Sequence, residues 1–405
     1  MPVEHVEMAG HIVDSLLLPK VLDAILSRGG RYHIEKLTLG ERQDDASHAR
    51  IRVEADTPAK LDAILADIHP HGAVPANPAD AVTAAADQPG CFPDGFYCST
   101  NFRTEVRVAG VWVPVQLQEM DCGIVVAGAS ARCVPMTQVQ VGDPVLVGRA
   151  GTRVFPPEGE ARKHELFEFM ASPVSSERPK AVSVREVAKA MRKCQADGLK
   201  VLAVLGPAVV HTGGGELVAK LVRDGLLDVL FAGNALATHD LEQSLYGTSL
   251  GVSFDHGLPT DEGHEHHLRS INTVRRLGGI AAAVESGRVQ SGIMYECVKK
   301  GVPTILCGSI RDDGPLPEVI TDALVAQDAM RAHVPGVGFC LMVATTLHSI
   351  AVGNLLPAWV KVACVDISPA TVTKLMDRGS TQTVGIVSDA EPFLRALVGE
   401  LDKSR

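Results

Sequence analysis

The stretch VKVACVDISP, residues 360–369, decides the fold of the C-terminal half of this chain. A run rich in valine ends at an acid, Asp366, and a serine and a proline follow it. Serine caps the N-terminus of a helix and proline fits its first position, so the pattern predicts a buried strand, a polar turn and then a helix. The same order recurs from about residue 180 onwards, which predicts an α/β domain with a parallel sheet and right-handed crossovers.

The expected strands of this sheet are short apolar runs, and segments with the 3.6-residue period of a helix lie between them. Parallel sheets of this type bind ligands beyond the carboxyl ends of their strands, so the residues that follow each run are the candidates for function. The expected strands are Val201–Val210, Leu227–Ala232, Thr304–Cys307, Gly338–Val343, Val360–Ile367 and Val384–Val387, and the helices towards the C-terminus are Pro317–Ala332, Thr346–Leu355, Pro369–Asp377 and Ala390–Leu401.

Two of the polar turns suit different parts of one dinucleotide. The stretch Ala344–His348 opens a helix, whose free N–H groups can hold a pyrophosphate. Asp366 lies 21 residues past Thr345, at the end of the next strand, where a carboxylate can accept hydrogen bonds from both hydroxyls of an adenosine ribose. An acid without an adjacent arginine favours NAD over NADP. The alternative is that Asp366 only caps a helix.

The glycine signature GxGxxG of dinucleotide-binding domains is absent from the sequence. Gly336-Val337-Gly338 precedes its strand instead of following it. Gly213-Gly214-Gly215 fits a turn for purely conformational reasons as well as it fits phosphate binding. The glycines alone therefore carry little weight.

The composition is that of an ordinary globular protein, with 405 residues, of which 46% are hydrophobic and 21% charged. The formal charge of −10, without a basic run, disfavours nucleic-acid binding. The N-terminus lacks the pattern of a signal peptide, and no window reaches the roughly 18 uncharged apolar residues of a membrane span, so we expect a soluble, cytoplasmic protein without a membrane partner. Nine singly spaced cysteines fit buried thiols in a reducing compartment.

Changes in composition and in the spacing of apolar residues predict three domains. Residues 1–90 read as a small α+β domain, with one helix over His11–Arg28 and another over Pro58–Ile68. Residues 91–178 carry short β-branched runs between glycines and prolines, which predicts a β-rich module for substrate recognition. Residues 179–405 form the α/β domain described above. The segment 70–92 reads as a linker or an exposed loop.

Several residues of the β-rich module suit the recognition of an amino-acid substrate. Arg103, beside Asn101, would bind a carboxylate, and Asp121 or the nearby Glu119 would bind an ammonium group. A structural ion pair explains these charges about as well.

Histidines gather between residues 256 and 267. His256, His264, His266 and His267 have nearby acids, but no recognisable zinc ligand set is complete, so we expect no metal site. His256 alone suits proton transfer, because imidazole titrates near neutrality. The GTSLG stretch at 247–251 matches the GxSxG motif of serine hydrolases, but it follows an expected helix instead of a strand, which argues against that function.

Several longer motifs resemble one enzyme family. HIVDS at 11–15, DGFY at 94–97 and MDC at 120–122 resemble the conserved region of lysine-oxoglutarate reductase/saccharopine dehydrogenase (LOR/SDH). GPAVVHTG at 206–213 and GSIRDDGP at 308–315 resemble the archaeal-type ornithine cyclodeaminases and the C-terminal module of the cyanobacterial arginine dihydrolase/ornithine cyclodeaminases. The resemblance covers nearly the whole chain. It implies a Rossmann-like NAD-binding fold similar to that of deoxyhypusine synthase, which would explain the absent glycine signature.

The family resemblance implies the conversion of L-ornithine to L-proline and ammonia, with tightly held NAD as the cofactor. The positions that match the family's cofactor contacts are nearly the strand-end positions selected above. They are Asn234, Ala235, Asp313, Thr345, Thr346, Leu347, His348, Asp366, Ile367, Asp389 and Ala390.

The mechanism that the resemblance implies is a transient oxidation of ornithine at Cα by NAD. The δ-amine then attacks this carbon, ammonia leaves, and the cyclic imine is reduced again. Such chemistry needs a group for the carboxylate, for which Arg311 or Arg103 are the candidates, and groups for proton transfer. Asp312, Asp313 and His256 are the candidates for proton transfer, although one of the two acids could serve the cofactor instead.

Two other functions remain open from the sequence. One is an NAD-dependent dehydrogenase that acts on lysine- or saccharopine-like amino acids, and the other is a non-catalytic sensor of NAD and amino acids. A homo-oligomer is the usual expectation for such an enzyme.

Overall fold

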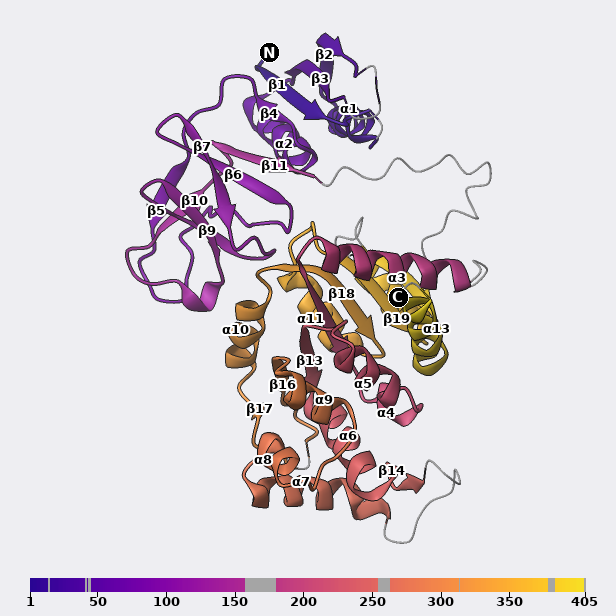
Figure 1. Cartoon of the computed structure of the whole chain (residues 1–405). Helices are drawn as coiled ribbons and strands as arrows, with labels where there is room; N and C mark the ends of the chain where they lie inside the picture. The colour runs from indigo at the N-terminus through magenta and orange to yellow at the C-terminus, as the bar shows by residue number, and fades with distance from the viewer. Residues whose placement is uncertain are drawn as a thin grey trace. The chain divides into compact units, whose positions relative to one another are not determined.

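The computed structural model describes residues 1–13, 15–40, 42, 45–156, 180–253, 263–312, 314–377 and 383–403. The chain divides into two compact units (Figure 1). Unit 1 comprises residues 1–166 together with the short segment 356–359, and unit 2 comprises residues 167–355 and 360–405.

Unit 2 is built on a seven-stranded parallel sheet, as the alternating pattern predicts. Its strands lie in the order β17-β16-β13-β12-β18-β19-β20. The strands are β12 (Lys200–Leu205), β13 (Val229–Gly233), β16 (Thr304–Cys307), β17 (Val319–Ile320), β18 (Val337–Val343), β19 (Lys361–Asp366) and β20 (Thr383–Val387).

The strand order reverses its direction between β12 and β18, because the chain builds the sheet outwards from β12 and then returns to β12's other side with β18. This doubly wound arrangement is that of a Rossmann-like fold, in which ligands bind at the reversal, the topological switch point.

The helices are α3 (Lys180–Ala196), α4 (Ala208–His211), α5 (Gly215–Arg223), α6 (Asn234–Tyr246), α7 (His266–Leu277), α8 (Ile280–Glu285), α9 (Ile293–Lys300), α10 (Ala323–His333), α11 (Thr346–Leu355), α12 (Pro369–Asp377) and α13 (Ala390–Asp402).

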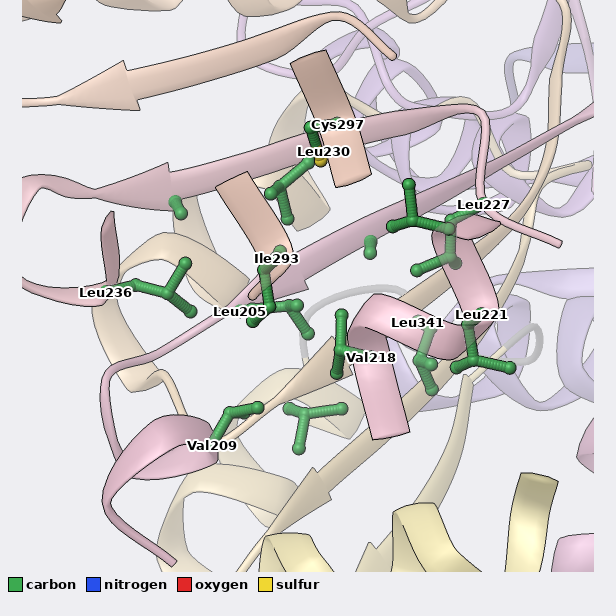
Figure 2. Packing of buried hydrophobic residues seen from close by; sticks show 14 of the residues in the cluster. Leu205, Val209, Val218, Leu221, Leu227, Leu230, Leu236, Ile293, Cys297 and Leu341 are labelled. Carbon is green, nitrogen blue, oxygen red and sulfur yellow. The ribbon is translucent and has the colours of Figure 1, made fainter. Parts of the chain in front are cut away.

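The helices cover both faces of the sheet. Helices α3, α5, α9 and α13 share one apolar core with alternate residues of the strands, whereas α10, α11 and α12 pack on the opposite face. Figure 2 shows part of the first core, where Leu205 of β12 and Leu230 of β13 lie against Ile293 of α9. Each such side chain is fully buried, which contributes about 1.5–3 kcal/mol relative to an exposed one.

Two expected elements of unit 2 begin or end elsewhere. The strand expected over Val201–Val210 ends at Leu205, and Ala208–His211 form the single helical turn α4. Pro207 explains this end, because proline has no N–H to donate to a neighbouring strand. The helix expected over Pro317–Ala332 starts only at α10, where the carboxylate of Asp322 accepts hydrogen bonds from the N–H groups of Leu324 and Val325.

The N-terminal part of unit 1 is a four-stranded sheet covered by two helices, in the order β2-β3-β1-β4. Strand β1, with alternating buried residues such as Val6 and Met8, was not expected from the sequence. Helix α1 begins at Leu17 instead of His11, because Leu16 has a left-handed backbone with φ 58°. The elements are β1 (Val3–Gly10), α1 (Leu17–Ser27), β2 (Arg31–Thr38), β3 (Ser47–Glu54), α2 (Pro58–Ile68) and β4 (Val74–Pro75).

The second sheet of unit 1 has seven short strands, in the order β11-β6-β7-β9-β8-β10-β5. It agrees with the β-rich character expected here, except that β5 lies inside the segment expected to be a linker. The strands are β5 (Val82–Ala85), β6 (Arg103–Val108), β7 (Val111–Gln116), β8 (Gly123–Ala127), β9 (Ser130–Val134), β10 (Pro144–Val147) and β11 (Thr152–Phe155).

The nine cysteines are all unpaired thiols. Cys91 and Cys98 of unit 1 are exposed, and the other seven are buried. Burial raises the pKa of Cys297 to about 12 and that of Cys307 to about 11, so these thiols stay protonated and unreactive. Among the described helices, none is long and apolar enough to cross a membrane.

Candidate functional site

A contact between two backbone segments forms the centre of the candidate site in unit 2. The N–H of Gly206, directly after β12, donates to the carbonyl oxygen of Val343 at 3.0 Å. A Cβ atom at position 206 would lie only 1.9 Å from the carbonyl oxygen of Ala344, so glycine alone permits this approach. The N–H of Ala344 in turn donates to Val365 on β19 at 2.9 Å. The turn after β18 is therefore held between both neighbouring strand ends at the switch point.

Ala344 itself has a left-handed backbone, with φ 54°. This conformation is uncommon for a residue other than glycine and costs free energy, and such residues concentrate at functional turns. It redirects the chain from β18 into α11, so that Thr345 and the first turn of α11 begin directly above the switch point.

The described cofactor candidates all follow the carboxyl ends of adjacent strands. Because β13, β12, β18, β19 and β20 are parallel neighbours, these ends lie along one edge of the sheet, as the sequence predicts. Asn234 and Ala235 follow β13, Thr345, Thr346, Leu347 and His348 follow β18, Asp366 and Ile367 end β19, and Asp389 and Ala390 follow β20.

Asp366 is the last residue of β19, and its side chain stabilises the turn that follows. Its residue is 8% exposed, and its Oδ1 atom accepts a hydrogen bond from the N–H of Ser368 at 2.8 Å. Its carbonyl oxygen accepts from the N–H of Ser388, after β20, at 3.1 Å. Within the described residues, the second carboxylate oxygen accepts no hydrogen bond. The capping role and a role towards a ligand are thus compatible.

The other acids and hydroxyls at this side of the sheet also have local partners. Asp389 is the N-cap of α13, and its carboxylate accepts from the N–H of Ala390 at 2.7 Å. The hydroxyls of Thr346 and Thr371 form a hydrogen bond of 2.8 Å that ties α11 to α12. Leu347 and Ile367, in contrast, are 76% and 71% exposed. These two aliphatic side chains are thus exposed at the same edge of the sheet as the polar turns.

His348 connects the two sides of the switch point. Its Cε1 atom lies 3.1 Å from where a Cβ of Gly233 would be, so the absence of a side chain at the end of β13 makes room for the imidazole. Burial lowers the pKa of His348, and the nearby carboxylate of Asp312 opposes this shift. Next to Gly233, the Oδ1 atom of Asn234 accepts from the N–H of Leu316 at 3.0 Å, which ties α6 to the loop after β16.

The loop after β16 holds the predicted catalytic residues Arg311 and Asp312. Asp312 accepts hydrogen bonds from the N–H of Ser309 at 2.8 Å and from its hydroxyl at 3.1 Å. Arg311 is exposed. Because β16 is a parallel neighbour of β13, the loop that carries Asp312 begins at the same edge of the sheet as the cofactor candidates. Asp313 and His256, also predicted for the site, lie outside the described residues.

The predicted substrate residues lie in unit 1. The carbonyl of buried Asn101 accepts from the N–H of Ala358, and Asp121, which has a left-handed φ of 61°, donates its N–H to Ser99. The guanidinium of Arg103 forms an ion pair of 2.6 Å with Glu105 and lies 4.6 Å from the centre of the Phe155 ring. The structural ion pair weighed for Arg103 is therefore present.

Helix α6 carries a buried polar cluster that was not predicted from the sequence. His239 and Glu242 were not singled out, and His211 was noted only as part of a motif, yet the three imidazole and carboxylate groups lie together inside unit 2. The signal was the THDLE stretch at 238–242, which places charged residues at buried positions of a helix. In the described part of the chain, no group of three or more histidine, cysteine, aspartate or glutamate side chains is arranged to hold a metal ion.

Comparison with known proteins accounts for the whole length of the chain. The family described as "Arginine dihydrolase ArgZ-like, C-terminal, Rossmann fold" matches residues 185–397, the "LOR/SDH bifunctional enzyme conserved region" matches residues 3–102, and the "first region" of the ArgZ-like C-terminus matches residues 103–184. The ornithine cyclodeaminase of Methanothermobacter thermautotrophicus is 50% identical over 405 residues, covering 100% of this chain and 98% of that protein. The chain belongs to the ornithine cyclodeaminase family.

Solved structures of family members agree with the fold. Apo ArgZ, a cyanobacterial arginine dihydrolase, has a TM-score of 0.84 at 40% identity, and this chain spans 59% of its length. A putative LOR/SDH protein from Methanococcus maripaludis S2 has a TM-score of 0.78 at 46% identity over 80% of this chain and 99% of its own. A third relative, AgrE, was solved as a ternary complex with ornithine and NAD⁺, with 42% identity over 100% of this chain and 58% of its own, and a TM-score of 0.55.

The residues of the candidate site fit NAD. The close approach of Gly206 and Ala344 brings the two strand ends of the switch point together, and the first turn of α11 begins above them. A helix N-terminus favours a pyrophosphate, and the second oxygen of Asp366 is available to ribose hydroxyls.

Proposed function

We propose that this chain converts L-ornithine to L-proline and ammonia, with NAD bound at the carboxyl edge of the seven-stranded sheet. The observation that carries the proposal is the meeting of Gly206, Ala344 and Asp366 at the switch point of the sheet. Family membership supports the choice of substrate, because full-length relatives are ornithine cyclodeaminases.

Each part of the cofactor has a group of this chain suited to hold it. The ribose would hydrogen-bond to Asp366, the pyrophosphate would lie at the N-terminal turn of α11, and Asn234 and Ala235 would contact the cofactor from β13's side. When bound, NAD⁺ supplies a reversible hydride acceptor for Cα of the substrate, so it is not consumed in the net reaction. We assign cofactor contacts to Asp389, Ala390 and Asp313 in the same way.

The substrate needs a positive group for its carboxylate and groups that move protons. Arg311, exposed on the loop after β16, is our candidate for the carboxylate, and Arg103, Asn101 and Asp121 are the candidates in unit 1. Asp312 and His256 are our candidates for proton transfer. The overall reaction balances as ornithine, C₅H₁₂N₂O₂, giving proline, C₅H₉NO₂, and NH₃.

The decisive experiment is an incubation of the purified protein with L-ornithine and an amount of NAD⁺ far below that of the substrate. We expect proline and ammonia to form in equal amounts without accumulation of NADH. NADH formed in proportion to the substrate would instead indicate a dehydrogenase, and binding without turnover would indicate a sensor.

The proposed activity also suggests a cellular location, a metabolic role and an assembly state for the protein. We place the enzyme in the cytoplasm, where it would supply proline from arginine and ornithine metabolism, and we propose that it works as a homo-oligomer. We also keep the functional division into residues 1–90, a substrate-recognition module over 91–178 and an NAD-binding domain over 179–405.

A further inference from the structure

Helix α6 carries charged side chains in positions that face the interior of unit 2. Thr238, His239, Asp240 and Glu242 are each at most 8% exposed. Buried ionisable groups cost free energy unless hydrogen bonds satisfy them, so a helix of this kind indicates a role beyond packing.

Glu242 is the centre of the cluster. Its carboxylate is fully buried and accepts hydrogen bonds from Nδ1 of His239 at 2.8 Å, from Oγ1 of Thr248 at 2.9 Å, and from the N–H groups of Gly251 at 2.9 Å and Leu250 at 3.2 Å. Burial raises the pKa of Glu242, but the hydrogen bonds from His239, Gly251 and Thr248 together bring it below its ordinary value. The carboxylate is thus ionised and fixed in place.

The ionised carboxylate determines the tautomer of His239. Because a carboxylate only accepts hydrogen bonds, Nδ1 of His239 carries the proton in this contact, and Nε2 has no hydrogen-bond partner among the described residues. The ring of His211 packs edge-on against His239, with 4.5 Å between centroids. Nδ1 of His211 bonds to the hydroxyl of Ser249 at 2.7 Å. Burial and the neighbouring His239 lower the pKa of His211 to about 4, so this second ring stays neutral.

The other titratable groups around the cluster come from α7 and the far side of α6. His266 bonds through Nδ1 to Oγ1 of Thr248 at 2.9 Å and stacks on Tyr246, and the ring of His267 lies 6.4 Å from that of His239. Asp240 points to another helix, where its carboxylate accepts from two N–H groups at the start of α9. No lysine or arginine ion pair with Glu242 occurs among the described residues.

The position of His239 relates it to the cofactor edge. Residues four and seven apart lie on one face of a helix, so Ala235, His239 and Glu242 form a single stripe along α6. Ala235 is a predicted cofactor contact, and His239 lies one turn, about 6 Å, further along the helix. His211 likewise lies five residues after Gly206 of the switch point. His239 is thus about one helical turn from a predicted cofactor contact, and the ring of His211 contacts it.

We propose that His239, in addition to the candidates Asp312 and His256, moves protons between the two nitrogens of the substrate, and that Glu242 positions it. This inference rests on the proposed function and adds a group that the sequence did not indicate. When the δ-nitrogen attacks the oxidised Cα, the new N–Cα bond forms from its lone pair and the bond from Cα to the α-nitrogen breaks. Starting from a δ-ammonium group, two protons leave the δ-nitrogen and two join the α-nitrogen, which departs as ammonium. Nε2 of His239 carries these protons one at a time and ends each turnover in its starting state.

The test compares wild-type enzyme with His239→Gln, Glu242→Gln and, as a matched control on the same helical stripe, Tyr246→Phe. Turnover of ornithine is measured as a function of pH, and the affinity for NAD⁺ is measured separately by calorimetry. We expect His239→Gln to lower kcat at least 100-fold, a typical contribution of acid–base catalysis, with an NAD⁺ affinity within about twofold of wild type. The Tyr246→Phe control should keep the wild-type kcat and pH profile.

Glu242→Gln provides the readout that a merely structural role would not change. The amide keeps the shape of the carboxylate but has no negative charge, so the protonated form of an imidazole beside it is less favourable in the variant than in wild type. We therefore expect kcat to fall about tenfold and the acid limb of the pH profile to move to lower pH. A His239→Gln enzyme with kcat within about threefold of wild type, or a Glu242→Gln enzyme with an unmoved acid limb, would overturn the proposal. If wild-type protein itself failed to convert ornithine, the proposed function would fail first, and the assignment of His239 with it.

Discussion

The two sides of the switch point in unit 2 use their charged residues in different ways. On the side of β18, β19 and β20, Asp366 and Asp389 accept hydrogen bonds from backbone N–H groups of the turns that follow them. On the side of β12 and β13, Glu242 and its partners form a cluster of side chains inside the protein. Asp366 and Asp389 thus stabilise the backbone of their own turns, whereas Glu242 on α6 is buried and bonded to other side chains.

This difference matches what the two halves of the proposed reaction require. A dinucleotide is bound by backbone N–H groups and one well-placed acid, which tolerate solvent. Proton transfer is tuned most easily where burial and hydrogen bonds control the protonation state. We therefore expect substitutions on the side of β18, β19 and β20 to change the affinity for the cofactor. Substitutions on the side of β12 and β13 should change how turnover depends on pH.

The largest expected effect comes from Gly206→Val, because this change affects both sides at once. The new Cβ would collide with the carbonyl oxygen of Ala344, and the two strand ends would have to separate. We expect a loss of unfolding free energy of about 3 kcal/mol or more, together with loss of NAD⁺ binding. Urea unfolding with and without NAD⁺ measures both effects.

The matched control for this variant is Gly399→Ala in α13. A Cβ at position 399 meets no atom within 4 Å, so alanine should raise the unfolding free energy by about 0.5–1 kcal/mol through its better helix propensity. Wild-type stability and cofactor binding in Gly206→Val would show that the switch point is not held by this contact.

The second prediction concerns Asp240, a buried acid on α6 that is not among the cofactor candidates. Burial raises the pKa of Asp240 to about 7, although the N–H groups of Met294 and Ile293 oppose the shift. The folded protein thus keeps a proton that the unfolded chain releases near the ordinary aspartate pKa of 3.8, so the unfolding free energy falls as the pH rises between these two values.

Asp240→Asn should remove this part of the pH dependence. It should also lower the unfolding free energy by about 2 kcal/mol, because the amide offers only one acceptor to two N–H groups. Urea unfolding of both proteins across this pH range measures the difference. A pH profile of stability that is parallel in the two proteins would contradict the assigned pKa.

The third prediction concerns cofactor affinity on the other side of the switch point. Asp366→Asn keeps an oxygen for the N–H of Ser368 but removes the charge, so the turn should persist while the bond to the ribose weakens. We expect the Kd for NAD⁺ to rise about tenfold and the preference over NADP⁺ to decrease. Calorimetry with both cofactors tests this, and an unchanged Kd would leave Asp366 with its capping role alone.

The smallest effect is expected from Asp389→Ala, which removes the N-cap of α13. Loss of such a cap typically costs about 1 kcal/mol of stability. Asp389→Ser, which can still accept from the N–H of Ala390, should restore most of it. Thermal unfolding of the two variants side by side provides the measurement.

Much of unit 2 could be predicted because its strands are fully buried and read as continuous apolar runs. Thr304–Cys307, Thr346–Leu355 and Pro369–Asp377 have the expected bounds. Strand β1 was missed because its alternation of valines with acids and histidines reflects one buried face only. The end of β12 was missed because the apolar residues 208–210 continue the pattern past Pro207 into a helical turn.

The candidate site was predictable only in part. The edge residues follow directly from the strand ends. The THDLE stretch shows that α6 carries charged residues, but their burial depends on how α6 packs against α4 and α7, which the local sequence does not specify. The contact of Gly206 with Ala344 likewise joins residues that are far apart in the sequence. Their roles towards cofactor and substrate stay predictions until the experiments above are done.

The inclusion of residues 356–359 in unit 1 has a spectroscopic consequence. The chain has two tryptophans, Trp112 and Trp359, and both belong to unit 1, whereas the proposed nicotinamide site belongs to unit 2. Energy transfer from indole to a reduced nicotinamide would therefore always cross from one unit to the other. Replacing either tryptophan by phenylalanine would leave a single donor. The efficiency of energy transfer would then report the distance between this tryptophan and the nicotinamide during turnover.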